Sequence, residues 1–165
     1  MKDEAHFDKT CTVRFERLLP GPLERVWEFI SDPKLLPGWF GEARIEPRTC
    51  GAFKLMDGHV QGVVTQWKPG RKLAYTWNVF VPDNVDSPYP ESYVTFELAA
   101  RGENVALTLT HVPVLERFEK QNAMGWHTFL DMLGAGVRGE AVKPRGEYMK
   151  RNALIYGVDL ANLER

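Results

Sequence analysis

The imidazole of His111 is the side chain in this sequence best placed to orient a polar group or to move a proton. It follows Val105, Leu107 and Leu109 in an alternating pattern, which places it on the apolar side of a strand. The pKa of an ordinary imidazole is about 6.5, which suits both hydrogen bonding to a ligand oxygen and proton transfer. Histidines at strand ends are also often satisfied structural groups, and the sequence leaves both interpretations open.

The other groups that could carry chemistry form no metal site and no activated nucleophile. The four histidines lack short ligand spacing, and Cys11 and Cys50 are too far apart for a C-x-x-C pair. Neither cysteine has an activating motif, and the sequence contains no G-x-S-x-G. We expect His59 and His127 to be exposed to solvent. The sequence therefore predicts no metal and no cofactor, and we assign no catalytic residue.

The charged side chains are expected to be solvated. The carboxylates considered for an acid–base pair are Glu42, Glu46, Glu97 and Asp131. None has a partner at a suitable spacing, and Glu97 and Asp131 both lie off the apolar faces. Four basic residues of the C-terminal segment most simply form a solvated helix face, and they are too few for a phosphate-binding surface. These four are Lys143, Arg145, Lys150 and Arg151.

The segment from Gly134 to Gly139 matches G-x-G-x-x-G, the fingerprint of dinucleotide-binding turns. That fingerprint must follow a strand and open a helix, whereas this segment ends a helical pattern. We therefore interpret its glycines as positions of close helix–sheet approach or as the end of the helix.

Aromatic and large apolar side chains form the candidate binding surface. They fall in segments that should face one another, and they either fill the core or line a ligand pocket. Trp39 and Phe40 follow a helix break, where an indole could act as a lid. The predicted cavity residues are Trp39, Phe40, Tyr75, Trp77, Phe96, His111, Trp126, Phe129, Leu130 and Leu133.

The elements that must position these side chains begin with a strand and two helices. The segment TCTVRFERLL has the period-two pattern of a half-buried strand. The apolar spacing of LERVWEFI predicts an amphipathic helix over residues 22–30. A second, short helix is expected after Asp32, which suits an N-cap, and Pro37-Gly38 ends it.

Residues 42–112 have the pattern of an antiparallel meander. Asp57-Gly58 indicates a two-residue hairpin turn, and Pro69-Gly70 fits a type II turn. Three prolines place residues 82–91 in a loop. Because short turns join consecutive strands, we expect neighbouring strands to pair antiparallel.

After Pro113 the apolar period returns to that of a helix. The stripe from Trp126 to Val137 predicts a long helix that Gly139 ends, and residues 144–165 are expected to form another helix. A sheet with one apolar face needs a cover, which the long helix supplies. The predicted class is therefore α+β, with room for a ligand between sheet and helix.

Length and composition describe an ordinary single domain. The chain has 165 residues, is 44% hydrophobic and 26% charged, and carries a formal net charge of −1. This balance provides no attraction to nucleic acid or anionic membranes, and no apolar run approaches the length of a membrane span. The polar N-terminus lacks an apolar signal segment, so we expect a cytoplasmic protein. Its two thiols, Cys11 and Cys50, are most simply unpaired, and their spacing alone leaves open whether they are neighbours.

Several segments have a familiar order and spacing. They are RFERLLPGPLERVWEFISDPKLLPGWF, GHVQGVV with RKLAYTW, LTLTH and GWHTFLDMLG, within residues 11–139. Together they resemble the activator of heat-shock protein 90 ATPase homologue family, in the START-like (SRPBCC, birch-pollen-allergen-like) superfamily. The resemblance implies a helix-grip fold, in which a curved antiparallel sheet wraps around a long C-terminal helix, with two short helices after the first strand. It also implies a hydrophobic cavity between the sheet and that helix.

The resemblance also bears on domains and partners. We expect residues 1–140 to form the helix-grip domain and residues 141–165 a helical extension packed on it. The segment MKRNALIYGVDLANL resembles a C-terminal extension of some bacterial members. The eukaryotic co-chaperone has an additional N-terminal domain, whereas about ten residues precede the first strand here, so we do not expect a chaperone partner.

Three functional hypotheses follow. The first is non-catalytic binding of a small hydrophobic or amphipathic molecule in the cavity of a bacterial, cytoplasmic protein, with His111 and Tyr75 orienting it. The second is a protein-interaction or co-chaperone-like module, in which residues 141–165 could form a homodimer contact and an apolar patch is exposed. The third is a cyclase or hydrolase that uses His111 as general acid or base.

Overall fold

The computed structural model of the chain describes residues 4–80 and 85–165. Within these ranges, seven antiparallel strands form one sheet with the order β1-β7-β6-β5-β4-β3-β2. The strands are β1 (Thr10–Pro20), β2 (Ala43–Ile45), β3 (Ala52–Leu55), β4 (Val60–Lys68), β5 (Lys72–Val79), β6 (Ser92–Arg101) and β7 (Asn104–Leu115). Strands β2 to β6 each pair with the next strand in sequence, and β1 pairs with β7.

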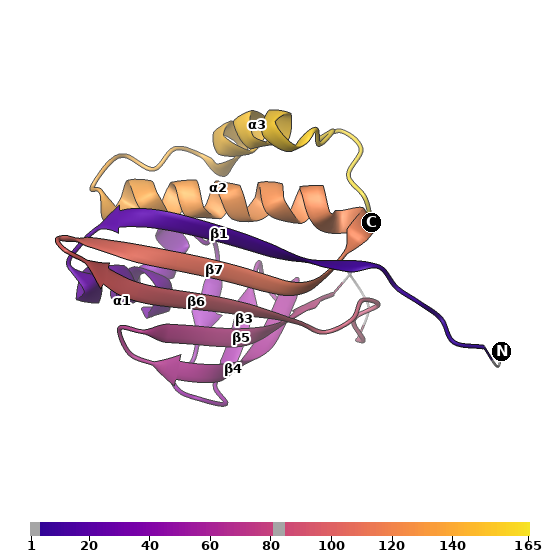
Figure 1. The fold of residues 1–165 in the computed structure, drawn as a ribbon, viewed down its shortest axis with the longest axis horizontal. Helices are drawn as coiled ribbons and strands as arrows, with labels where there is room; N and C mark the ends of the chain where they lie inside the picture. The colour runs from indigo at the N-terminus through magenta and orange to yellow at the C-terminus, as the bar shows by residue number, and fades with distance from the viewer. Residues whose placement is uncertain (1–3, 81–84) are drawn as a thin grey trace.

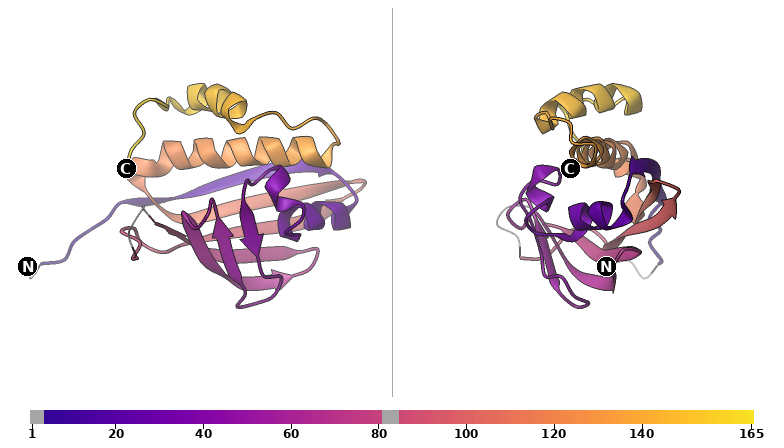
Figure 2. Two further views of the ribbon diagram at one scale, coloured as in Figure 1. Left: turned by 180° about the vertical axis from the view of Figure 1, so that it is seen from behind. Right: turned by 90° about the vertical axis from the view of Figure 1, so that its left-hand side faces the viewer.

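Helices α1 (Leu23–Ser31) and α2 (Glu119–Val137) lie on the concave side of this sheet, and α3 (Arg145–Tyr156) packs on the outer side of α2. The 3₁₀ turns are η1 (Leu36–Gly38) and η2 (Glu116–Phe118). Figure 1 shows α2 running alongside β1, with α3 on its far side. Seen from the end of the molecule, the sheet curves around α1 and α2 (Figure 2). None of the helices in the described ranges has the length and hydrophobicity to cross a membrane.

This architecture confirms the predicted α+β helix-grip class. The curved sheet, the long C-terminal helix, two short helical elements after the first strand and an extra C-terminal helix are all present. Strand β7 carries His111 on its inward face, where the residue is 3% exposed. The predicted loop at residues 82–91 lies partly outside the described residues, and β6 begins directly after it at Ser92.

The two predicted turns differ in outcome. Pro69-Gly70 forms the expected turn, since Arg71 N donates to Lys68 O at 2.9 Å and Gly70 has φ +72°. The prediction of a two-residue turn at Asp57-Gly58 was wrong. Leu55 pairs with Val60, so the loop spans residues 56–59, because three consecutive residues from Met56 to Gly58 have positive φ and open a wider turn.

The helix predictions fail at the start of the second helix and at the end of the last one. The second predicted helix is only the 3₁₀ turn η1, which ends at Gly38 as expected but begins at Leu36, so Asp32 is not its N-cap. Asp32 Oδ1 instead accepts from Lys34 N at 2.9 Å in the turn before η1. Helix α2 ends as expected before Gly139, which has φ +74°. The helix predicted to reach residue 165 was wrong beyond Tyr156, because Gly157 takes a left-handed conformation and ends α3 there.

The glycine fingerprint lies where the helix interpretation put it, within the last turns of α2 and just beyond them. Gly136 allows close approach between helices: a Cβ at this position would lie 3.0 Å from Cε1 of Phe29 on α1. The glycine therefore serves the packing of α1 against α2, in place of the expected contact with the sheet.

The pairing of β4 with β5 requires a glycine at position 62. A Cβ at Gly62 in β4 would lie 1.8 Å from the carbonyl oxygen of Thr76 in β5. Beside it, the Thr76 hydroxyl accepts a hydrogen bond from Val63 N at 2.8 Å. The Thr76 hydroxyl thus takes the place of a main-chain acceptor between the two strands. Only glycine fits at position 62, where the two backbones approach so closely.

Replacing Gly62 by alanine should destabilise the protein, because the added methyl group overlaps main-chain atoms that cannot move without parting β4 from β5. We expect a loss of roughly 2 kcal/mol or more in the free energy of unfolding, measured by urea denaturation. Gly146→Ala is the matched control, since a methyl group on Gly146 would meet no atom within 4 Å beyond its own helix backbone and chain neighbours. A loss at Gly62 no larger than at Gly146 would contradict the packing described here.

Candidate functional site

A cavity of about 530 Å³, partly open to solvent, lies between the sheet and the N-terminal end of α2. We call it the end cavity. Its walls come from the β3–β4 loop, the ends of β5 and β7, the start of β6, the first turns of α2 and the last residues of the described chain. The lining residues are Thr10, Met56, His59, Val60, Trp77, Val79, Tyr89, Pro90, Ser92, His111, Pro113, Val114, Leu115, Phe118, Gln121, Asn122, Leu163, Glu164 and Arg165.

Most of this lining is apolar, and a small polar group lies on its inner wall. Trp77, Tyr89 and Phe118 supply aromatic surface, with aliphatic side chains between them. Ser92 and His111 are buried and hydrogen bonded to each other. An apolar hollow with a few converging polar groups is the usual form of a small-molecule site.

The protonation of His111 follows from its partners. Trp126 Nε1 lies 3.0 Å from His111 Nδ1, and an indole N–H can only donate, so Nδ1 is the unprotonated nitrogen. The amide nitrogen of Asn122 donates to the same atom at 3.1 Å. The proton is therefore on Nε2, which donates to Ser92 Oγ at 2.8 Å.

The chain of hydrogen bonds ends on the sheet and keeps the imidazole neutral. Ser92 Oγ donates onward to the carbonyl oxygen of Trp77 at 3.0 Å. Burial lowers the pKa of His111 to about 4, because the charged imidazolium is poorly solvated inside the protein. Both ring nitrogens are engaged, so His111 offers no free lone pair to act as a general base in this arrangement.

One polar atom of the group is left without a partner. Asn122 Oδ1 is buried and accepts no hydrogen bond from the described residues. The orientation of the amide is set by His111, because an oxygen facing the lone pair of Nδ1 would be repelled. Such a buried acceptor costs free energy unless a donor reaches it.

Of the ten predicted cavity residues, two line the end cavity: Trp77 and His111. Leu130 instead lines a second cleft, described below. The other seven lie in the core, and none of them lines either cavity; they are Trp39, Phe40, Tyr75, Phe96, Trp126, Phe129 and Leu133. As ligand contacts these residues remain a prediction.

Aromatic rings in the core pack directly on one another. Trp39 and Phe40 stack with centroids 4.5 Å apart, and Phe40 meets Phe129 edge-on at 4.9 Å. The ring of Trp126 lies 5.1 Å from that of Trp77, which is the point where this packed core reaches the end cavity. The core therefore forms the back wall of the cavity.

The C-terminal segment lines part of the end cavity. Gln121 donates from Nε2 to the carbonyl oxygen of Glu164 at 3.2 Å, and Glu164 N donates to Gln121 Oε1 at 3.0 Å. These two bonds hold the segment against the first turns of α2, beside Leu163. Nothing in the sequence pattern indicated this contact, or the role of Ser92 and Asn122, because it arises from segments far apart in the chain.

Two residues expected in solvent belong to a cluster between α2 and α3. The His127 side chain is 20% exposed, and its Nδ1 lies 2.8 Å from the Tyr156 hydroxyl. Asp131 Oδ2 accepts from Arg151 at 3.0 Å and from Asn152 at 3.2 Å. The expectation that His127 is solvated was wrong, because α3 packs over the face of α2 that its apolar stripe leaves polar. His59 and Glu97 are exposed as expected.

The predicted solvated face of the last helix also needs one correction. The Arg145 guanidinium carbon lies 4.8 Å from the ring centroid of Phe129, and the residue is partly buried. Its charge lies over an aromatic face, an arrangement that is favourable for a cation. Leu154 and Ile155 are the apolar residues of this helix that point to solvent.

Comparison with known proteins identifies relatives in sequence and structure. The sequence profile of the family described as "Activator of Hsp90 ATPase homolog 1-like protein" matches residues 20–137. No curated protein matches the chain.

Solved structures share the fold across most of the chain. A protein from Bordetella parapertussis, encoded by gene BPP1335, is 28% identical, with 98% of this chain and 91% of that chain covered and a TM-score of 0.70. CalU16 from Micromonospora echinospora is 23% identical, covering 90% and 87%, with a TM-score of 0.71. DynU16, a protein in the dynemicin biosynthetic locus, is 23% identical, covering 81% of this chain and 50% of its own, with a TM-score of 0.70.

The buried neutral His111 should make the protein less stable in mild acid. Its pKa falls from 6.5 in the unfolded chain to about 4 in the folded one, so between these values the unfolded chain binds more protons and stability rises with pH. Lowering the pH from 7 to 4 should cost up to about 3 kcal/mol through this group.

Urea denaturation at both pH values, on the native protein and on His111→Gln, measures this contribution as the difference between their pH dependences. His59→Gln is the control, because His59 is exposed and should leave the pH dependence unchanged. Parallel pH dependences of the native protein and His111→Gln would contradict the assignment.

Proposed function

The chain belongs to the family of activator of Hsp90 ATPase homolog 1-like proteins, and from this premise we propose that it binds a small, neutral, amphipathic molecule in its end cavity. The observation that carries the proposal is an apolar cavity of about 530 Å³ lined in part by Asn122, whose buried Oδ1 has no hydrogen-bond partner among the described residues. Binding would be non-catalytic.

The volume and the apolar walls favour a ligand of small-molecule size. Ligand pockets are typically about 300–1,000 Å³ and mostly apolar. Each Å² of apolar ligand surface removed from water would contribute about 25 cal/mol. Trp77, Tyr89 and Phe118 would supply the largest flat contacts, which suits an aromatic or polycyclic body.

The polar wall favours a ligand that donates a hydrogen bond. Asn122 Oδ1 is an acceptor, and the Nδ1 lone pair of His111 is already taken by two N–H donors. A hydroxyl, phenol or amide N–H on the ligand would satisfy Asn122, whereas an ionised carboxylate would meet an acceptor oxygen. His111 would thus affect the ligand by orienting the amide of Asn122. Tyr75 is 2% exposed and would serve as part of the hydrophobic core, without contacting the ligand.

The engagement of both ring nitrogens argues for binding over acid–base catalysis. A general base needs a lone pair within hydrogen-bond reach of the proton it removes. The occurrence of DynU16 in a biosynthetic locus supports a small organic molecule as the ligand of this fold.

Binding of N-phenyl-1-naphthylamine, a neutral probe whose fluorescence rises in apolar surroundings, tests the cavity itself. The native protein should bind it with saturation, and Trp77→Ala should weaken binding about tenfold, since a buried aromatic contact is worth about 1.5 kcal/mol. Trp67→Ala is the matched control, because Trp67 is also partly buried but packs on Trp27, away from the cavity. Equal effects of the two substitutions, or no saturable binding, would refute the proposed site.

A pair of probes that differ in one hydrogen-bond donor tests the polar wall. The native protein should prefer 1-naphthol over 1-methoxynaphthalene by about fivefold, since one hydrogen bond contributes about 1 kcal/mol. Asn122→Leu should abolish this preference and leave the affinity for 1-methoxynaphthalene unchanged. Asn78→Leu, which alters an amide outside the lining, should keep the preference. Equal binding of both probes by the native protein, measured by isothermal titration, would disprove the role of Asn122.

A further inference from the structure

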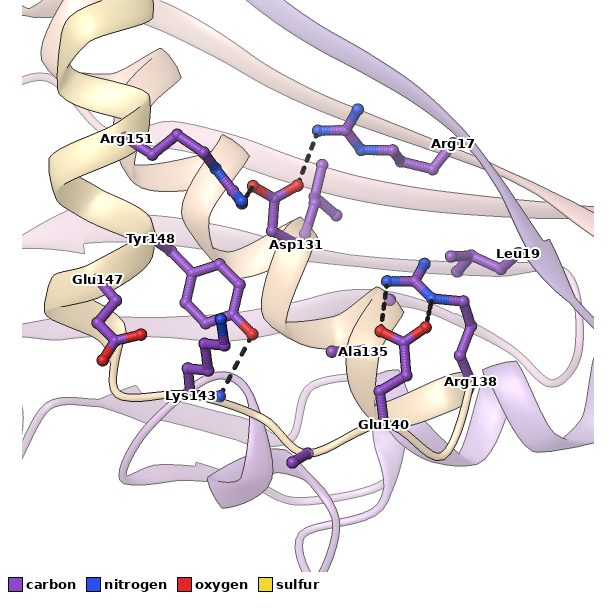
Figure 3. A pocket seen from close by; sticks show the side chains of 13 residues that line it. Arg17, Leu19, Asp131, Ala135, Arg138, Glu140, Lys143, Glu147, Tyr148 and Arg151 are labelled. Carbon is purple, nitrogen blue, oxygen red and sulfur yellow. Dashed lines mark hydrogen bonds and ion pairs between the residues drawn. The ribbon is translucent and has the colours of Figure 1, made fainter.

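A second cavity, of about 470 Å³, lies between β1, the C-terminal half of α2 and α3 (Figure 3). We call it the charged cleft. It lies toward the opposite end of α2 from the end cavity, and the two share no lining residue. We propose that the charged cleft binds a small organic oxyanion, a carboxylate or a phosphate monoester.

One guanidinium nitrogen beside the cleft has no acceptor among the described residues. Arg17 Nη2 is buried and makes no hydrogen bond within the described part of the chain. The nearest carboxylate oxygen of its ion-pair partner, Asp131 Oδ1, lies 3.7 Å away, which is too far for a hydrogen bond. A buried charged donor left in this state costs more than a neutral one, so the Arg17 guanidinium beside the cleft is short of an anionic acceptor.

The carboxylate beside Arg17 accepts its hydrogen bonds from other side chains. Asp131 accepts from Arg151 at 3.0 Å and from Asn152 at 3.2 Å, both at Oδ2. One carboxylate therefore stands between two guanidinium groups, and it neutralises only one of them. In Figure 3, Arg17 and Arg151 reach Asp131 from opposite sides, one from β1 and the other from α3.

A further cation is held in place at the floor of the cleft. The Arg138 guanidinium folds back over Gly134, where a Cβ would lie 2.9 Å from Nη1. Glu140 orients it through two hydrogen bonds, of 2.9 and 3.3 Å. Because Gly134 has no side chain, the Arg138 guanidinium has room to lie against α2 beside the cleft.

The charges of the lining favour an anion by a small margin. The lining contains four cationic side chains and three carboxylates. Two of the carboxylates, Asp131 and Glu140, are paired with arginines, and Glu147 is the third, on α3. Leu19, Leu130 and Ala135 supply apolar surface between the charges, which favours an anion with an organic body over a bare ion.

The folded 165-residue protein is titrated with phenyl phosphate and with benzoate at low salt, and backbone amide NMR shifts are followed. At least one probe should saturate, with the largest shifts at the lining residues near Arg17 and Arg138. Arg17→Met should weaken this binding at least tenfold. Arg14→Met is the matched control, because Arg14 lies on the same strand, is exposed and does not line the cleft; it should leave the affinity unchanged. Glu147→Gln should not weaken it.

Further readouts separate a binding role of Arg17 from a structural one. The melting temperature of Arg17→Met should not fall, because Arg151 still neutralises Asp131. N-phenyl-1-naphthylamine in the end cavity should not compete with the anion. Equal effects of Arg17→Met and Arg14→Met, shifts that do not map to the cleft, or a clear fall in melting temperature would each overturn the proposal, whatever the outcome in the end cavity.

Discussion

The hydrogen bond from the Trp126 indole N–H to His111 Nδ1 is the contact on which the arrangement of the end cavity depends. It links α2 to β7, with 3.0 Å between the two nitrogens, and it fixes the tautomer of the imidazole, with the proton on Nε2. From there the bonds continue through Ser92 to the main chain of Trp77, so three strands and a helix are tied together by one polar chain. Because that chain is complete, the oxygen of Asn122 is the member of this group that has no partner in the described part of the chain.

Helix α2 organises two sites of different character, one toward each end. At its N-terminal end, aromatic and aliphatic side chains and a closing C-terminal segment form an apolar hollow. Toward its C-terminal end, β1 and α3 bring arginines and carboxylates together around Asp131. The middle of the helix supports neither, because the rings of Trp39, Phe40 and Phe129 occupy that space. A helix-grip fold can therefore be solid at its centre and still be open at its end.

Local patterns predicted what depends on local physics. The alternation ending at His111 placed this residue inside, and Gly139 and the Pro69-Gly70 turn behave as their backbone preferences require. The length of the loop after Leu55 was missed, because three successive positive φ angles have no clear signature when only one of the residues is glycine.

What could not be predicted depends on contacts between distant segments. Asp131 and His127 lie off the apolar stripe of α2, and the packing of α3 on one side and of Phe15 and Arg17 of β1 on the other removes them from solvent. Asn122 is an ordinary polar residue in the first turn of a helix until His111 and Trp126 fix its amide. The ring residues face one another as the sequence suggested, but whether rings interlock or leave a hollow is decided by side-chain packing across five elements.

A crystal structure with N-phenyl-1-naphthylamine bound tests the central claim most directly. We expect the probe in the end cavity, its rings against Trp77 and Phe118 and its N–H within about 3.2 Å of Asn122 Oδ1. A probe that instead separates the stacked rings of Trp39 and Phe40, or that lies only on the outer surface, would contradict it.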